Sequence, residues 1–242
     1  MILEIDLGNS RLKWREVDRN GTRGPVGWLN SPVLNLGLEI HLTELPRRIR
    51  VASVRTPADE AALSAWADAR FGIIPEFARS TAAIAGVLNG YDRPEALGID
   101  RWLAVLSAFT AERAPVIVMD FGTAMTADVI SADGRYLGGF IAPGLSTMKR
   151  SLLWGTDRVR FDESLLSESL RPATDTQCAV NRGTMLAVTG FATSCWTQCQ
   201  AISRAPKALL TGGDAAAIAS YLTFPFEIRP DLVLDGLAIA LP

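Results

Sequence analysis

Two regions of the chain share one pattern of hydrophobic and polar positions: an apolar strand, a short polar turn with a glycine, and a returning strand. Ile2–Leu7 is followed by Leu12–Val17 across a Gly-Asn-Ser turn, which predicts a hairpin at the start of the chain. Pro115–Gly122 ends in the same way and is followed by the predicted strand Met125–Ser131. We therefore expect two domains of related build, divided near Ala111–Ala114.

Apolar residues at helical spacing follow the first hairpin. Beyond the short predicted strand Ile49–Val54, Pro57 and Asp59 are typical of a helix start. Both tryptophans of this region, Trp66 and Trp102, are expected in the core. The apolar face predicted for the first helix consists of Ala62, Ala65, Trp66 and Ala69, and that of a second helix consists of Trp102, Val105, Leu106 and Phe109.

The second half of the chain contains further signals for strands and for helices. Asp133-Gly134 predicts a tight turn between Met125–Ser131 and a strand at Tyr136–Ile141. Strands mixed with helices predict an α/β fold. The remaining expectations are a helix across Thr176–Gln200, a strand at Ala208–Thr211, a helix at Asp214–Leu222, and strand and loop without sustained periodicity in Gly21–Pro46.

Composition narrows the class of protein. The chain has 242 residues, of which 48% are hydrophobic and 21% charged, and its net charge is −2. These values are typical of a folded globular protein, and the balanced charge gives no footprint for nucleic acid or an anionic membrane. The longest apolar stretches, such as Trp102–Phe109, are too short to span a membrane, and the amino terminus lacks the features of a signal peptide. We expect a cytoplasmic protein with no nucleic-acid or membrane partner.

The cysteines do not predict metal chemistry. Cys195 and Cys199 are one helical turn apart, but no second pair exists, Cys178 stands alone, and His41 is the only histidine. Buried thiols on a helix are the favoured interpretation. Neither a disulfide framework nor a zinc site is expected.

The two turns carry the same chemical pattern, Asp-x-Gly followed by Asn or Thr, at Asp6 and at Asp120. Glycine lets the backbone approach an anion, and successive N–H groups in such a turn bind phosphate oxygens. The aspartate would hold a hydrated Mg²⁺ that bridges the phosphates, and Lys13 could reach the same anion. Asp-x-Gly also occurs in ordinary tight turns, but the second copy and a third glycine-rich strand end, Thr211-Gly212-Gly213-Asp214, favour nucleotide binding. Neither a P-loop nor a Rossmann motif is present.

Gly98-Ile99-Asp100-Arg101 offers a carboxylate and a cation just ahead of the second predicted helix. Asp100 could accept the proton of a hydroxyl group that attacks phosphorus, while Arg101 binds substrate oxygens. The alternative is that Asp100 caps the helix and Arg101 is a solvated first-turn residue. Spacing alone favours this alternative.

The ordered set of motifs resembles the type III pantothenate kinases, the ATP-dependent enzymes that open coenzyme A biosynthesis. This family lies within the actin-like and sugar-kinase ATPase superfamily. The resemblance implies two ribonuclease-H-like lobes with mixed sheets flanked by helices and a cleft between them, at residues 1–112 and 113–242. The matching segments are Asp6–Ser10, Asn89–Tyr91, Gly98–Arg101, Asp120–Ala124, Leu137–Gly144, Thr211–Gly213, Pro230–Val233 and Gly236-Leu237.

The resemblance also implies roles for individual residues. Asp100 would be the general base on the primary hydroxyl of pantothenate, and Asp120 would hold a monovalent cation, K⁺ or NH₄⁺. ATP and Mg²⁺ would be bound by the first motif, with Asp6 holding Mg²⁺ through water, and Thr123 would contact ATP from the second. The expected ATP-binding residues of the first motif are Asp6, Leu7, Gly8, Asn9, Ser10, Arg11, Leu12 and Lys13, and the expected pantothenate-binding residues are Tyr91, Gly98, Ile99, Asp100, Arg101 and Thr176.

The family pattern implies a homodimer, with the substrate site close to the interface. The chain departs from the family pattern at two positions. Ser10 stands where many relatives have Thr, and Asp175, which precedes Thr176, stands where many relatives have Asn. Three alternatives stay open. The chain could be another acyl or sugar kinase on the same scaffold, a regulatory nucleotide-binding protein related to transcription accessory factors, or a chaperone-like ATPase. Intact Asp6, Asp100 and Asp120 favour the kinase, and no peptide-binding domain is present.

Overall fold

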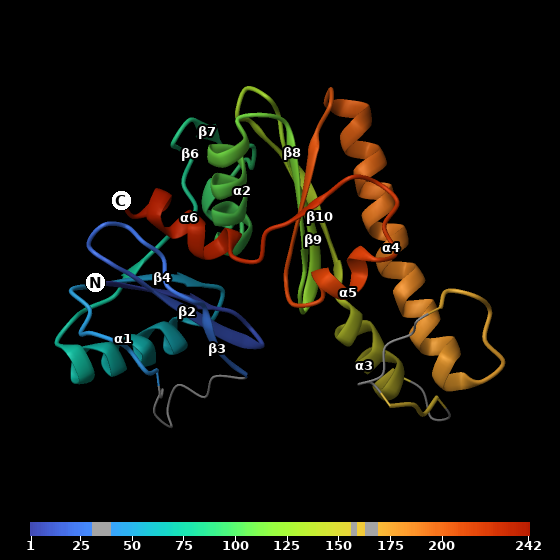
Figure 1. Cartoon of the computed structure of the whole chain (residues 1–242), viewed down its shortest axis with the longest axis horizontal. Helices are drawn as coiled ribbons and strands as arrows, with labels where there is room; N and C mark the ends of the chain where they lie inside the picture. Colours follow the sequence, from blue (N-terminus) through green and yellow to red (C-terminus); the bar gives the residue numbers. More distant parts are fainter. Residues whose placement is uncertain (31–39, 156–158, 163–168) are drawn as a thin grey trace. The chain divides into compact units, whose positions relative to one another are not determined.

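The computed structural model describes residues 1–30, 40–155, 159–162 and 169–242, and they form two compact units (Figure 1). Unit 1 contains Met1–Thr110 and Asp231–Pro242, and unit 2 contains Ala111–Pro230. The sequence placed the division at 112/113 and assigned everything after it to the second domain. In the structure the last segment instead belongs to unit 1, because its helix packs on the first sheet.

Unit 1 is built on a five-stranded sheet of order β3-β2-β1-β4-β5. The predicted hairpin is confirmed: β1 and β2 are antiparallel, and β4 pairs in parallel with β1. Part of the loop region predicted in Gly21–Pro46 lies outside the described residues. The elements are β1 (Ile2–Leu7), β2 (Arg11–Val17), β3 (Gly27–Asn30), β4 (Arg48–Ser53), α1 (Pro57–Phe71), β5 (Glu76–Phe77), β6 (Ala83–Ile84), β7 (Val87–Leu88), a short 3₁₀ helix (Pro94–Ala96), α2 (Ile99–Glu112) and α6 (Leu232–Ala240).

One face of this sheet is apolar and is covered by α1 (Figure 1). Thr56 and Asp59 form a capping box at the start of α1, as the predicted helix start requires. The predicted apolar face of α1 was partly wrong: Leu63 and Ala67 are buried, whereas Ala65 and Ala69 are exposed. The larger leucine gains more from burial than the alanines do, and it therefore sets the rotation of the helix. Trp102 is fully buried in α2, as expected, while Trp66 packs at the edge of the core.

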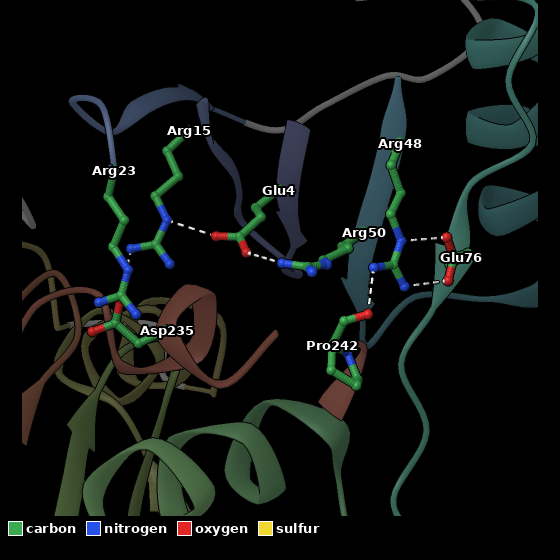
Figure 2. Close-up of polar contacts among 8 residues, drawn as sticks. All are labelled: Glu4, Arg15, Arg23, Arg48, Arg50, Glu76, Asp235 and Pro242. Atoms are coloured by element: carbon green, nitrogen blue, oxygen red, sulfur yellow. Dashed lines mark hydrogen bonds and ion pairs between the residues drawn. The ribbon is translucent and has the colours of Figure 1, made fainter. Parts of the chain in front are cut away.

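The opposite face of the same sheet is charged, because alternate residues of a strand point to opposite sides. Glu4 faces Arg15 on β2 and Arg50 on β4, and one step further along β1, Asp6 faces Lys13. Helix α6 packs against β1 and β4 and pairs with this face through Asp235 (Figure 2).

Unit 2 repeats the plan with a sheet of order β10-β9-β8-β11-β12. The hairpin predicted at Asp133-Gly134 is present, since β9 and β10 are antiparallel and Gly134 has a φ of 81°. The sequence missed helix α3, and α5 is shorter than predicted. The elements are β8 (Val116–Phe121), β9 (Ala124–Ile130), β10 (Tyr136–Pro143), α3 (Leu145–Gly155), α4 (Thr176–Ile202), β11 (Lys207–Thr211), α5 (Ala215–Ala219) and β12 (Glu227–Ile228).

The core of unit 2 lies between its sheet and α4, which packs against β8 and β9. Cys195 and Cys199 lie on α4 and are buried in this core, so the interpretation of these cysteines as buried thiols is confirmed. Burial raises the pKa of each thiol to about 11. Both side chains therefore remain neutral thiols at physiological pH.

Candidate active site

The turn after β1 is shaped by Gly8. The Gly8 N–H donates to the carbonyl of Arg11 at 3.0 Å, and a Cβ on Gly8 would lie 2.9 Å from that same oxygen. Only glycine therefore fits this turn without displacement of the backbone. Asn9 and Ser10 are exposed at its tip, where their groups can reach an anion. The side chains of Leu7 and Leu12 are fully buried, so these two residues can offer an anion only their backbone.

Asp6 lies at the end of β1, directly opposite Lys13 on β2. Burial raises the pKa of Asp6 from 3.8 to about 6; Lys13 opposes this rise, and the Asp100 carboxylate adds to it. The first two predicted acids thus lie within electrostatic reach of one another in unit 1. A desolvated carboxylate beside a second one is an arrangement that a cation stabilises.

Asp100 lies in the first turn of α2 and is half-buried. The helix begins at Ile99, so Asp100 is within the helix and is not its N-cap, which removes the alternative that the spacing favoured. One of its oxygens, Oδ1, accepts a hydrogen bond from the Arg101 N–H at 2.8 Å. A Cβ on Gly98 would lie 2.7 Å from this Oδ1. Gly98 therefore provides the space that the carboxylate occupies.

Arg101 and Tyr91 form a polar pair in unit 1. The Arg101 Nη1 donates to the Tyr91 hydroxyl at 3.0 Å, and Arg101 is 7% exposed, which excludes the solvated first-turn alternative. Asn89, a residue of the matching motif to which the sequence gave no role, accepts from the Tyr91 N–H at 3.0 Å and donates to two backbone carbonyls. Asn89 thus orients the loop that carries Tyr91. The side chain of Ile99 is buried and has a packing role.

Arg55 is a residue of this region that the sequence analysis missed. Its Nη1 donates to the carbonyl of Asn9 in the turn at 3.2 Å, and its other nitrogens donate to Asp59 at the start of α1. A signal was available: the capping sequence Thr56-Pro57-x-Asp59 places Arg55 between strand and helix. The strand before it, β4, is parallel to β1, so both strands end at the same edge of the sheet.

The corresponding turn in unit 2 is held by backbone contacts. Gly122 N–H donates to the carbonyl of Ala124 at 3.1 Å, and the carbonyl of Thr123 accepts from Gly144 N–H at 3.0 Å and from the Thr147 hydroxyl at 2.6 Å. A Cβ on Gly144 would lie 2.0 Å from the carbonyl oxygen of Gly122. The start of α3 therefore packs directly on this turn, and Thr123 itself is exposed.

Asp120 lies at the end of β8, opposite Thr211 of the parallel strand β11. Gly212 follows with a φ of 94°, and a Cβ there would lie 2.4 Å from Asp120 Oδ1 and 2.5 Å from the carbonyl oxygen of Phe121. The carboxyl ends of the two parallel strands therefore bring a carboxylate oxygen and a backbone oxygen to the same glycine. Oxygen donors of these kinds suit a hard cation.

Thr176, the last of the predicted substrate residues, is the first residue of α4 and is exposed. Asp175 caps this helix by accepting from the Cys178 N–H at 2.8 Å, and that hydrogen bond is the largest cause of a lowered pKa of Asp175. Asp and Asn are equally good N-caps. The departure from the family pattern at position 175 therefore leaves the position of Thr176 intact.

Within residues 1–30, 40–155, 159–162 and 169–242, no three His, Cys, Asp or Glu side chains gather into a metal-binding group. In the same ranges, no helix combines the length and the apolarity that a membrane crossing needs.

Comparison with known proteins gives consistent results. The family model described as type III pantothenate kinase matches residues 2–198. A type III pantothenate kinase of Pseudomonas fluorescens (strain SBW25) is 39% identical over 257 residues, covering 100% of this chain and 99% of the relative.

Solved structures show the same fold at low identity. A Campylobacter jejuni protein described as a Baf family transcriptional activator has a TM-score of 0.61 at 23% identity, covering 98% of this chain and 95% of its own. A Sinorhizobium meliloti protein described as a 2-dehydro-3-deoxygalactonokinase has a TM-score of 0.56 at 12% identity, covering 99% and 98%. The expected α/β fold, with mixed sheets flanked by helices, is thus confirmed. The family match and the full-length relative establish that this chain belongs to the type III pantothenate kinase family.

Proposed function

We propose that this protein transfers the γ-phosphoryl group of ATP to the primary hydroxyl of pantothenate, giving 4'-phosphopantothenate, the first step of coenzyme A biosynthesis. Membership of the family supports this proposal. The structural observations that carry it are the glycine turn beside Asp6 and Lys13 and the Asp100 carboxylate in the space that Gly98 leaves. One acid would serve the metal-bound phosphates and the other the accepting hydroxyl, as phosphoryl transfer requires.

The first turn fits a magnesium-bound phosphate group. Asp6 is a desolvated carboxylate with a raised pKa, and the described residues contain no cluster of three acidic or other metal-binding side chains. This arrangement suits Mg²⁺, which proteins often hold with one or two carboxylates plus water and substrate phosphates. Bound there through water, Mg²⁺ would neutralise phosphate charge. The Gly8–Ser10 backbone and Lys13 would bind the phosphate oxygens, and Thr123 would also contact ATP.

Asp100 would accept the proton of the pantothenate hydroxyl as its oxygen attacks the γ-phosphorus. Gly98 leaves the space in which this carboxylate lies. Arg101, held by Tyr91 at 3.0 Å, would bind pantothenate oxygens, and Thr176 would add a hydroxyl. Positioning and electrostatics, without a covalent intermediate, would supply the rate enhancement.

Asp120 would hold a monovalent cation, K⁺ or NH₄⁺. The fit rests on its Oδ1 and the carbonyl oxygen of Phe121, which both approach Gly212. Since K⁺ is bound by carboxylate and carbonyl oxygens, the donor types are suitable. The cation would fix the second turn.

We also propose a cytoplasmic homodimer. The edge strand β10 exposes Leu137 (42%), Phe140 (45%) and Ile141 (64%). Apolar side chains on a sheet edge favour coverage by another surface, and a second copy of this chain would provide it. Sedimentation of the purified protein would measure this association.

The deciding experiment is phosphorylation of pantothenate by purified protein with ATP and Mg²⁺, with and without K⁺. The expected product is phosphopantothenate in a 1:1 ratio with ADP, and sugars or short acyl acids should not replace pantothenate. Turnover of another acceptor in its place would identify a different kinase. Nucleotide binding without any transfer would instead favour the regulatory alternative.

A further inference from the structure

The C-terminal motif, Pro230–Val233 with Gly236-Leu237, has no role in the reaction described so far. In the structure its helix, α6, belongs to unit 1. It contacts two other elements of that unit: the charged face of the sheet, and α2. These are the elements that carry Asp6 and Asp100.

The contact with the sheet is an ion-pair chain (Figure 2). Asp235 on α6 accepts from Arg15 Nη1 at 2.6 Å, and Arg15 Nε in turn donates to Glu4 at 2.7 Å. Arg50 donates to the other oxygen of Glu4 at 3.2 Å, and Arg23 adds a second cation to Asp235 at 2.8 Å. Glu4 is 0% and Arg15 2% exposed. The ion pairs thus pass through Glu4 on β1, two residues before Asp6.

The contact with α2 is made by Gly236. A Cβ at this position would lie 2.3 Å from the carbonyl oxygen of Leu103 and 2.7 Å from its Cβ. The two helices therefore approach so closely that the backbone of one touches the backbone of the other, which only glycine permits. Leu103 is three residues after Asp100, less than one turn along the same helix.

Stability alone does not account for this ion-pair chain. Buried ion pairs add little net stability compared with apolar residues of the same volume. Among the described residues, Arg15 Nη2 and Arg50 Nε are buried without a hydrogen-bond partner, which is a further cost. Apolar anchoring of α6 is already supplied by Leu232, Leu234 and Leu237. The charged contacts instead fix the orientation of α6 on the sheet, because each guanidinium sets the lateral position of the carboxylate that it binds.

We propose that α6 is a positioning element of the active site: Asp235 fixes it, through Arg15 of β2 and Glu4, to the strand that carries Asp6, and Gly236 fixes it to the helix that carries Asp100. In this way α6 sets the separation of the two carboxylates. The inference rests on the proposed function for its kinetic consequence, but its structural content concerns only unit 1. Asp235 and Gly236 act through other residues and touch neither substrate.

The test variant is Gly236→Ala, whose added methyl group must push α2 away from α6. We expect kcat to fall about 10–100-fold, since a displacement on the order of 1 Å at a reacting group has such effects. KM for ATP should change by less than about threefold, because the turn that binds ATP stays in place. The matched control is Gly190→Ala, a helical glycine on α4 whose Cβ would meet nothing within 4 Å. It should leave both constants unchanged.

Asp235→Asn is the second variant, in case the first does not fold. It keeps the shape of the side chain and removes its charge, and we expect the same loss of kcat with little change in KM, while Asp235→Glu restores part of the rate. Unchanged kcat in a folded variant, or a fall in kcat matched by an equal rise in KM, would overturn the inference.

Crystal structures of the wild type and both variants test the role of α6 without a measurement of enzyme activity. The separation of the Asp6 and Asp100 carboxylates should change in the variants by about 1 Å, the displacement on which the kinetic expectation rests. An unchanged separation overturns the inference. A wild-type protein that does not phosphorylate pantothenate would overturn the proposed function instead, and the structures would still decide the role of α6.

Discussion

The two acid-tipped turns, one in each unit, have the same order of strand, Asp-x-Gly and returning strand, yet they are held in different ways. In unit 1, Asp6 is surrounded by charge: Lys13 faces it, Asp100 acts on it, and Arg55 holds the turn through the carbonyl of Asn9. In unit 2, the turn is held mainly by backbone. The carbonyls of Phe121 and Thr123 accept from main-chain N–H groups, and two glycines lie against it.

This difference shows that two copies of one sequence motif can have different properties, because the residues packed around each copy differ. Burial of Asp6, together with the charges of Lys13 and Asp100, makes its ionisation, and therefore its chemistry, sensitive to its surroundings. Close backbone contacts around Asp120 make the second turn sensitive to shape. Substitutions in the first turn should therefore change activity more than stability, and substitutions around the second should change stability as well.

The largest expected effect is that of Asp100→Asn. Loss of a general base costs about 10²–10⁴-fold in turnover, and we expect kcat for pantothenate to fall within this range. The exposed Asp92→Asn is the matched control from the same region and should be fully active. Thermal unfolding of both variants should resemble that of the wild type. Full activity of Asp100→Asn would show that another group accepts the proton.

Gly212→Ala tests the packed turn of unit 2. The new methyl group would lie 2.4 Å from Asp120 Oδ1 and 2.5 Å from the Phe121 carbonyl oxygen, and the φ of 94° disfavours alanine. We expect a loss of about 1–3 kcal/mol in the free energy of unfolding, measured by urea denaturation, together with lower activity. Gly183→Ala, where nothing lies within 4 Å, is the control. Equal stability of the two variants would contradict the packed description of this turn.

Asp6→Asn should separate activity from stability in unit 1. The pKa of Asp6 is raised from 3.8 to about 6 in the folded protein, so between these pH values the folded state keeps a proton that the unfolded state has lost. Its contribution to stability is therefore present below pH 4 and is lost as the pH rises through about 6.

The Asn variant does not ionise, and in the absence of Mg²⁺ it should be more stable than wild type at pH 8, by about 1–3 kcal/mol. The gain should vanish near pH 4, and phosphoryl transfer should be slower than in the wild type at every pH, by less than Asp100→Asn slows it. Thermal melts across this pH range measure the effect. A variant less stable than wild type at pH 8 would rule out a desolvated, ionised Asp6.

The smallest effect is expected for Arg55→Met. It removes the hydrogen bond to the Asn9 carbonyl, which is worth about 0.5–1.5 kcal/mol, together with the partly exposed ion pair to Asp59. KM for ATP should rise about 3–10-fold with kcat nearly unchanged. Arg70→Met, a change of the same kind on the exposed side of α1, is the control. A fall in kcat alone would place the role of Arg55 outside the binding of ATP.

Local sequence signals predicted most of the fold. The apolar runs on either side of the Gly-Asn-Ser turn predicted β1 and β2, and Asp133-Gly134 predicted the hairpin of β9 and β10, because each signal depends on neighbours in the chain. The missed helix α3 has no N-cap signal, since it begins directly after Gly144 on the second turn. The rotation of α1 was misjudged because alanines tolerate either face of a helix.

The residues of the candidate site also fall into two groups: those that the sequence could predict and those that it could not. The repeated Asp-x-Gly pattern made Asp6 and Asp120 candidates, whereas Asp100 became one only through the resemblance of the ordered motifs to a known family, because spacing alone favoured a helix cap. Arg55, Asn89 and the contacts of α6 are different: their partners lie elsewhere in the chain, as far apart as Arg15 and Asp235, 220 residues from one another. No local pattern encodes such a pair.

By itself, the sequence determined the strands, the main helices, the glycine turns and the acids available for chemistry, because each follows from propensity and spacing within a few residues. Only the tertiary structure decided that Asp6 and Asp100 affect one another, that Gly98 makes room for a carboxylate, and that the last helix belongs to the first unit. Desolvation, charge coupling and backbone approach depend on distances in space, and these arise only when remote segments pack together.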